Sequence, residues 1–129
     1  MMNESRCFLG AVSAGMKIFA IGGRKETCLT ETVEIYDPIR DSWQMGPSLN
    51  SARHSFGATV VNNIIYAVGG QTEKGTIQSV EMLDPREGRW IQLGSLSWSR
   101  AGLACCPTDH HLFAVGGHNG RSVLGSAEI

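Results

Sequence analysis

The stretch NNIIYAVGG, from Asn62 to Gly70, decides the fold. Its two asparagines tolerate a positive φ and predict a tight turn. The β-branched, aromatic and small residues that follow predict a short strand. The closing glycines predict a sharp exit from that strand, because glycine adopts backbone angles that other residues resist. The same phrase occurs as GMKIFAIGG from Gly15 to Gly23, and as HHLFAVGG from His110 to Gly117.

The phrase belongs to a longer internal repeat with a constant offset of 47 residues. An arginine, a glutamate, an Asp-Pro dipeptide and a tryptophan recur in the same register as the glycine pairs, without a gap. Repeats of this period indicate a solenoid or a propeller. The recurring positions are Gly22-Gly23, Gly69-Gly70 and Gly116-Gly117; Arg6, Arg53 and Arg100; Glu34, Glu81 and Glu128; Asp37-Pro38 and Asp84-Pro85; and Trp43 and Trp90.

Each unit is predicted to form four short antiparallel strands. In the second unit these are expected at residues 55–61, 64–70, 79–84 and 89–96. No helical period appears, and turn signals are too dense for helices, so the fold class is all-β. We divide the chain into a lead-in (1–5), two full units (6–52 and 53–99) and a third unit (100–129) that stops inside its third strand. A four-stranded unit of this length suits a propeller blade.

The order of these landmarks resembles the kelch repeat. The forms VEIYDP…W and VEMLDP…W are similar to the kelch domains of BTB-kelch proteins, and the resemblance covers Arg6 to Ile129. It implies a β-propeller, usually of six blades, whose first strands line a central channel and whose fourth strands lie outermost. The chain would then be an incomplete propeller: a fragment, a shortened product, or a subunit completed by another chain. Exposed edges and blade faces favour instability or self-association.

Most of the recurring residues are expected to have structural roles. The glycine pairs are joints, since neither a Gly-Lys-Ser/Thr sequence nor a helix N-terminus follows them to hold a phosphate. Trp43 and Trp90 are expected to pack between neighbouring sheets. The recurring glutamates (Glu34, Glu81, Glu128) need a fixed partner, because an unpaired buried carboxylate is costly.

Composition and motifs argue against several function classes. A net charge of -1 gives no bulk attraction to nucleic acid or to an anionic membrane. No apolar run approaches the roughly 20 residues of a membrane helix, and no basic region precedes the short apolar stretch near the start, so a cytoplasmic protein is expected. The four cysteines (Cys7, Cys28, Cys105, Cys106) are predicted to be buried, reduced thiols.

No catalytic or metal site is predicted. The segment CCPTDHH (105–111) lacks the C-x2-C spacing that brings two thiolates to one zinc ion. His54 has serine neighbours but no identified acid to orient it. We therefore expect neither an enzyme nor a bound cofactor; the copper ligands of galactose-oxidase-like enzymes are not recognisable.

A partner-binding face is predicted from the resemblance. In kelch propellers the loops between second and third strands, and those that enter each first strand, gather at one face. Two alternatives stay open for the repeated arginines, which either grip a partner's carboxylate or phosphate or pair with a structural group such as the recurring glutamate. Trp98, which replaces Ser51 of the preceding repeat, is either an anchor for a partner or packs between blades. The candidate face comprises Arg6, Arg53, Arg100, Arg24, Gln71, His118, His54 and Trp98.

Protein–protein recognition is the predicted function. The resemblance implies the substrate-recognition propeller of a BTB-kelch adaptor for a cullin–RING ubiquitin ligase, although BTB and BACK domains are absent here. The partner would be a protein or peptide at the loop face. An actin-binding cytoskeletal scaffold is the alternative, and a metal oxidase is the weakest hypothesis.

Overall fold

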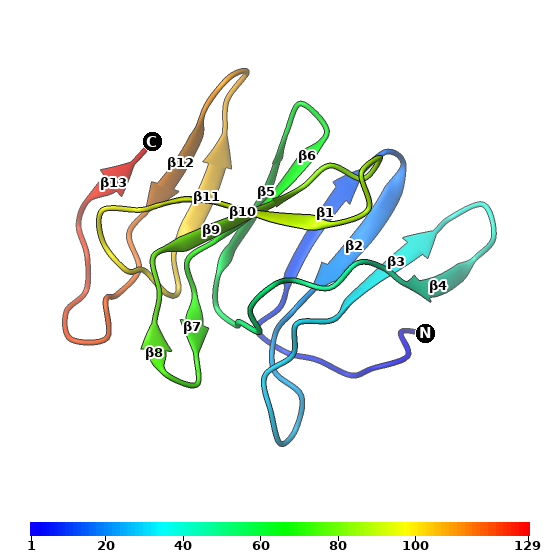
Figure 1. Cartoon of the computed structure of the whole chain (residues 1–129), viewed down its shortest axis with the longest axis horizontal. Helices are drawn as coiled ribbons and strands as arrows, with labels where there is room; N and C mark the ends of the chain where they lie inside the picture. Colours follow the sequence, from blue (N-terminus) through cyan, green and yellow to red (C-terminus); the bar gives the residue numbers. More distant parts are fainter.

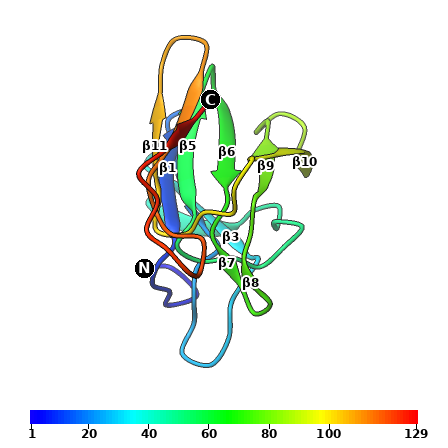
Figure 2. The same cartoon turned by 90° about the vertical axis from the view of Figure 1, so that its left-hand side faces the viewer.

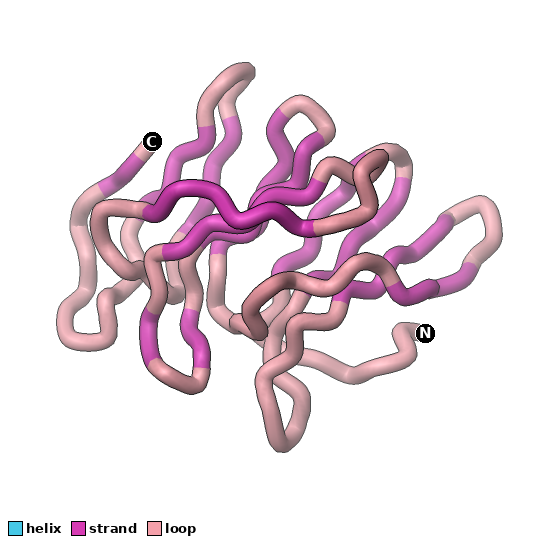
Figure 3. The backbone as a smooth tube through the Cα atoms, in the orientation of Figure 1, coloured by secondary structure: helices cyan, strands magenta, loops and turns pink.

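Antiparallel strands and loops make up the whole chain in the computed structural model, which describes residues 1–129 (Figures 1 and 3). No helix is present that is long and apolar enough to cross a membrane. The strands form three successive sheets, one for each sequence repeat, and a small separate hairpin. The predicted all-β class, with blades of an incomplete propeller, is confirmed.

The first two sheets are complete four-stranded blades. In both, the strands lie in chain order across the sheet, from the first to the fourth strand of the repeat. The first blade consists of β1 (Gly10–Ala14), β2 (Lys17–Ile21), β3 (Val33–Asp37) and β4 (Ser42–Met45). The second consists of β5 (Gly57–Val61), β6 (Ile64–Val68), β9 (Ser79–Leu83) and β10 (Trp90–Ser95).

The third sheet has three strands, with β12 between β11 and β13, so β13 has a free edge. A two-stranded hairpin is inserted in the second blade between β6 and β9, where no strand was expected. The third blade consists of β11 (Ala104–Pro107), β12 (Leu112–Val115) and β13 (Ala127–Glu128), and the inserted hairpin of β7 (Gln71–Thr72) and β8 (Gly75–Thr76).

The three blades stack through their first strands: β5 contacts β1 on one side and β11 on the other. The β1–β2, β5–β6 and β11–β12 hairpins point to one end of the molecule, and the loops that follow β2, β6 and β12 point to the other (Figures 1 and 2). The turn between β5 and β6 is the predicted one, since Asn62 and Asn63 have φ values of 50° and 61°. The repeat therefore places all loops of one kind at the same end.

The hydrophobic core lies between the first and second blades. Trp90 is only 5% exposed there, and its indole N–H donates to the carbonyl of Pro47 in the neighbouring blade at 2.9 Å. Trp90 thus packs between sheets as predicted. Trp43 instead lies half-buried against Tyr36 of its own blade, with ring centroids 5.3 Å apart, because no blade covers its outer side. The core comprises Ala14, Phe19, Ile21, Val33, Leu49, Phe56, Ile65, Ala67, Leu83 and Trp90.

The glycine pairs join each blade to the next. Gly69 and Gly70 have φ values of 62° and 100°, as a sharp exit from β6 requires. The N–H of Gly70 donates to the carbonyl of Arg100 in the third blade at 2.6 Å, and the N–H of Gly23 donates to Arg53 in the second blade at 2.8 Å. A Cβ atom on Gly69 would lie 2.5 Å from the Arg100 carbonyl oxygen. The joint therefore needs glycine for its backbone angles and for this close approach.

The cysteines differ from the prediction. All four are free, but Cys7, Cys28 and Cys106 are exposed, so the expectation of burial is wrong for them. Only Cys105 is partly buried: burial raises the pKa of its thiol to about 11. It lies in the contact between blades, where its Sγ packs against Gly57 of β5.

Replacing Gly69 with alanine is expected to destabilise the protein more than replacing Gly88. Both glycines have positive φ (62° and 72°), but a Cβ atom on Gly88 meets nothing within 4 Å. Gly88→Ala should cost about 1 kcal/mol of unfolding free energy from backbone strain alone. Gly69→Ala should cost about 2 to 4 kcal/mol, because the Arg100 carbonyl must also move. Urea unfolding measures both; equal losses would show that the joint tolerates a side chain.

Candidate functional site

A buried ion pair lies in the second blade, where β6 ends and β9 begins. The Arg53 Nη2 atom lies 2.8 Å from the Glu81 Oε2 atom, and both side chains are fully shielded from solvent. The Arg53 Nη1 atom also donates to the carbonyls of Gly69 and Ser79, each at 3.0 Å. One guanidinium thus links the end of β6 to the start of β9. The planar fork of arginine suits this arrangement, which a single ammonium group could not reproduce.

The same ion pair recurs in the other blades. Arg6 pairs with Glu34 at 3.0 Å, and Arg100 pairs with Glu128 at 2.9 Å. In each blade the arginine also donates to the carbonyl of the first glycine of the joint. A hydroxyl completes the set at the same offset, supplied by Thr32, Ser79 and Ser126. These hydroxyls were not predicted, although their spacing of 47 residues is visible in the repeat.

The glutamate of each pair also holds the segment that enters its blade. The backbone N–H of Asn50 donates to the Glu81 Oε1 atom at 2.7 Å, and that of Asn3 donates to the Glu34 Oε1 atom at 2.6 Å. The N–H of Ser97 donates to Glu128 in the same way. Residues 1–5, expected to be a lead-in, therefore occupy the place of an inter-blade linker.

These contacts answer the question left open for the repeated arginines. Arg53 and Arg100 are fully buried, and the side chain of Arg6 is shielded as well. Each pairs with the recurring glutamate of its own blade, which is the structural alternative. In this conformation none of the three guanidinium groups is available to a partner at the surface.

Hydrogen bonds to the carboxylates of Glu34 and Glu128 lower their pKa values. Burial alone would raise the pKa of Glu34, but the N–H groups of Asn3 and Glu4 and the guanidinium of Arg6 hold it below its usual value of 4.5. Burial alone would also raise the pKa of Glu128, but hydrogen bonds from Ser97 and Arg100 hold it below 4.5. Both carboxylates thus stay ionised at neutral pH, where they accept these bonds.

The loops after β2, β6 and β12 form the candidate binding face (Figure 1, lower edge). Each is tied to the residue that follows the repeated arginine by an antiparallel bridge. These bridges are Cys7 with Arg24, His54 with Gln71, and Ala101 with His118. The residue after each glycine pair therefore lies at the loop face, where sequence analysis placed it.

Three of the predicted face residues meet in one polar pocket. Arg24 comes from the first blade, and His54 and Gln71 from the second, and together they line a hollow of about 280 Å³. Arg24 is exposed and forms no ion pair within 4 Å. The other lining residues, none of which was predicted to belong to the binding face, are Thr27, Cys28, Leu29, Thr72 and Glu73.

His54 is held in its neutral form in this pocket. Burial lowers its pKa from 6.5, and the positive charge of Arg24 lowers it further. Its Nδ1 atom lies 2.9 Å from the hydroxyl of Ser55. A neutral imidazole at pH 7 offers one donor and one acceptor. Arg24 therefore supplies the positive charge of the pocket.

The remaining predicted residues lie at the loops of the third blade. Trp98 is 59% exposed, so its ring is not packed between blades as one alternative held. Its backbone N–H is directed at Glu128, which fixes the loop that carries it. His118 is half-buried, and its Nδ1 atom accepts the N–H of Gly120 at 3.3 Å. Neither residue lines the pocket of Arg24, His54 and Gln71.

The segment 105–111 builds no metal centre. No group of three or more histidine, cysteine, aspartate or glutamate side chains is placed to hold a metal ion. His110 and His111 are exposed on the β11–β12 hairpin, at the end of the molecule opposite the loop face.

Comparison with known families agrees with this architecture. The family model for the kelch motif matches residues 5–50 and again 52–97, which together make up more than half of the chain. The chain belongs to the kelch-motif family. No curated protein matches it significantly. Kelch repeats generally mediate protein–protein binding, which supports a protein–protein interaction module.

Acid should destabilise the protein through Glu34 and Glu128. Their pKa values are below 4.5 in the folded state, so their contribution is complete above pH 4.5 and is lost as pH falls toward the folded pKa. Between pH 5 and pH 3, roughly, the unfolding free energy of the unmodified protein should fall more steeply than that of Glu34→Gln. Denaturant unfolding at several pH values measures this. Parallel curves would show that Glu34 does not titrate with folding.

Proposed function

We propose that the loop face binds an extended peptide segment that carries an acidic side chain. The observation that carries this proposal is the unpaired guanidinium of Arg24 beside His54 and Gln71. Arginine binds carboxylates through two parallel N–H bonds. The neutral imidazole and the amide add hydrogen-bonding groups that suit a peptide backbone. The carboxylate of Glu73, which also lines the pocket, disfavours a second acidic residue next to the first.

Trp98 supports the same proposal as an apolar anchor. A tryptophan that is 59% exposed on a fixed loop offers a large surface at low entropic cost. The partner would then contact an acid-binding pocket between the first and second blades and an aromatic side chain at the third. Recognition surfaces typically combine polar contacts with contacts to an apolar aromatic side chain.

We further propose that the chain serves as the substrate-recognition part of a BTB-kelch adaptor of a ubiquitin ligase in the cytoplasm. The kelch motif and the VEIYDP and VEMLDP forms support this role. The proposal includes no enzymatic activity, no cofactor, and no binding to nucleic acid or membrane. Actin filaments are the alternative partner. Co-sedimentation of the protein with filamentous actin would support a cytoskeletal role in place of the adaptor role.

Selection from a random peptide library tests the loop-face proposal. Enriched peptides should contain an acidic residue, and Arg24→Glu should weaken their binding by roughly tenfold or more, because attraction becomes repulsion. Trp98→Ala should weaken it by a similar factor. Arg40→Glu is the matched control, since Arg40 is an exposed arginine in the β3–β4 turn, outside the loop face. If Arg40→Glu weakens binding as much as Arg24→Glu, the assignment of the pocket is wrong.

A further inference from the structure

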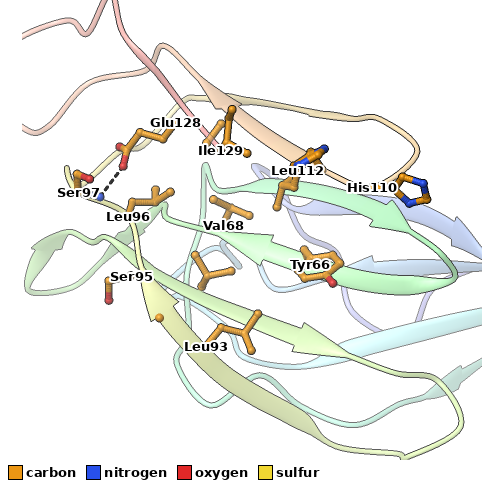
Figure 4. Close-up of a pocket in the computed structure, with 14 residues that line it drawn as sticks. Tyr66, Val68, Leu93, Ser95, Leu96, Ser97, His110, Leu112, Glu128 and Ile129 are labelled. Atoms are coloured by element: carbon orange, nitrogen blue, oxygen red, sulfur yellow. Dashed lines mark hydrogen bonds between the residues drawn. The ribbon is translucent and has the colours of Figure 1, made fainter.

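A second aromatic side chain is exposed at the loop face besides Trp98. Of the nine aromatic side chains in the chain, only Trp98 and Phe8 are exposed, at 59% and 62%. Trp98 lies on a loop that is fixed by the N–H of Ser97, which donates to Glu128 (Figure 4). Phe8 lies in the segment that enters β1, and it was not predicted to belong to the binding face.

Phe8 lies directly beside the pocket of Arg24, His54 and Gln71. The centroids of the Phe8 and His54 rings are 6.0 Å apart and the rings are tilted by 50°, which is within the usual range of aromatic pairs. The residue before Phe8, Cys7, forms the antiparallel bridge with Arg24. His54 therefore neighbours both the positive charge of the pocket and an apolar ring that is still largely open to solvent.

The backbone of Phe8 has a conformation that suits glycine. Its φ value is 53°, and the counterparts of Phe8 in the next two repeats, Ser55 and Gly102, have φ values of 52° and 64°. This conformation links the blades, since the N–H of Ser55 donates to the Phe8 carbonyl at 2.9 Å and the N–H of Gly102 donates to the Ser55 carbonyl at 2.7 Å. Glycine adopts it without strain, as in the third repeat, whereas a bulky side chain there is an outlier. Strained residues of this kind cluster at functional sites.

The openness of this position does not depend on the first blade lying at one end of the stack. Ser55 has a blade on each side, because β5 contacts both β1 and β11, and yet it is only half-buried. Gly102 is exposed as well. Residues at this repeat position therefore remain accessible from the loop face even between two blades.

Strain by itself does not mark a binding residue. Met16, in the turn between β1 and β2, has a φ value of 63° and is 85% exposed, but it lies at the end of the molecule opposite the loop face. Phe8 differs from Met16 because its ring packs beside a pocket residue, His54. The combination of strain, exposure and this neighbour identifies Phe8.

We propose that Phe8 is a specificity-determining residue that binds an apolar side chain two positions from the acidic residue of the bound peptide. This inference rests on the proposed binding of an acidic peptide at the loop face. In an extended peptide, side chains two positions apart share one face and are roughly 6.6 Å apart. That spacing matches the 6.0 Å between the rings of Phe8 and His54. One peptide can therefore direct its carboxylate to Arg24 and lay its apolar side chain on Phe8.

Two libraries of short synthetic peptides test the role of Phe8, one with a fixed central glutamate and one with a fixed central glutamine, and with random residues elsewhere. From the glutamate library, the unmodified protein should enrich aliphatic or aromatic residues two positions from the glutamate. Phe8→Gly should lose this preference and bind the enriched peptides roughly tenfold more weakly. Met16→Gly is the matched control, since it relieves the same backbone strain and removes an exposed apolar side chain at the opposite end. It should leave the preference unchanged.

Urea unfolding of both variants separates binding from folding. Phe8→Gly should not lower the urea midpoint, because glycine relieves the strain at this position. No apolar preference in the unmodified protein, or the same preference in Phe8→Gly, would overturn the role of Phe8 while an advantage of glutamate over glutamine upholds the acidic pocket. Absence of that advantage would overturn both proposals. A lowered midpoint with weaker binding of every peptide would make Phe8 a structural residue and would also overturn its assigned role.

Discussion

The buried arginine–glutamate pair is the interaction on which the rest of the structure depends. In the second blade it joins Arg53 to Glu81 at 2.8 Å inside the blade. The arginine binds the carbonyls that end β6 and begin β9, and the glutamate binds the linker that arrives from the first blade. One ion pair therefore fixes the geometry within a blade and the position of its neighbour. A buried pair with all these partners is costly to break by removing either side chain alone.

The glycine joint works with this pair. Arg53 and Arg100 use their side chains within the blade, and their backbone carbonyls accept the N–H of the glycine joint of the preceding blade. Each of these arginines therefore stabilises its own blade through its side chain and contacts the preceding blade through its backbone carbonyl. This arrangement holds the loops after β2 and β6 side by side, where Arg24, His54 and Gln71 line one pocket. The loop face is thus a consequence of the repeat, although the side chains that line its pocket are not repeated.

The sequence predicted the fold well, because the offset of 47 residues places strands, turns and glycines without reference to tertiary contacts. It also predicted that Arg24, Gln71 and His118 lie at the loop face. It could not decide between two roles for Arg53, since burial depends on which blade covers it. The exposure of Cys7, Cys28 and Cys106 was not predicted either, since burial depends on tertiary contacts.

A double-mutant cycle between Arg53 and Glu81 tests the central claim most directly. The cycle combines Arg53→Lys and Glu81→Gln and compares the unfolding free energies of the single and double variants. If the pair organises the blade, the two substitutions are not additive, and their coupling energy is about 1 to 3 kcal/mol. Additive losses, with coupling below about 0.5 kcal/mol, would contradict the account. They would mean that each side chain acts through its other partners and that the ion pair itself does not hold the blade together.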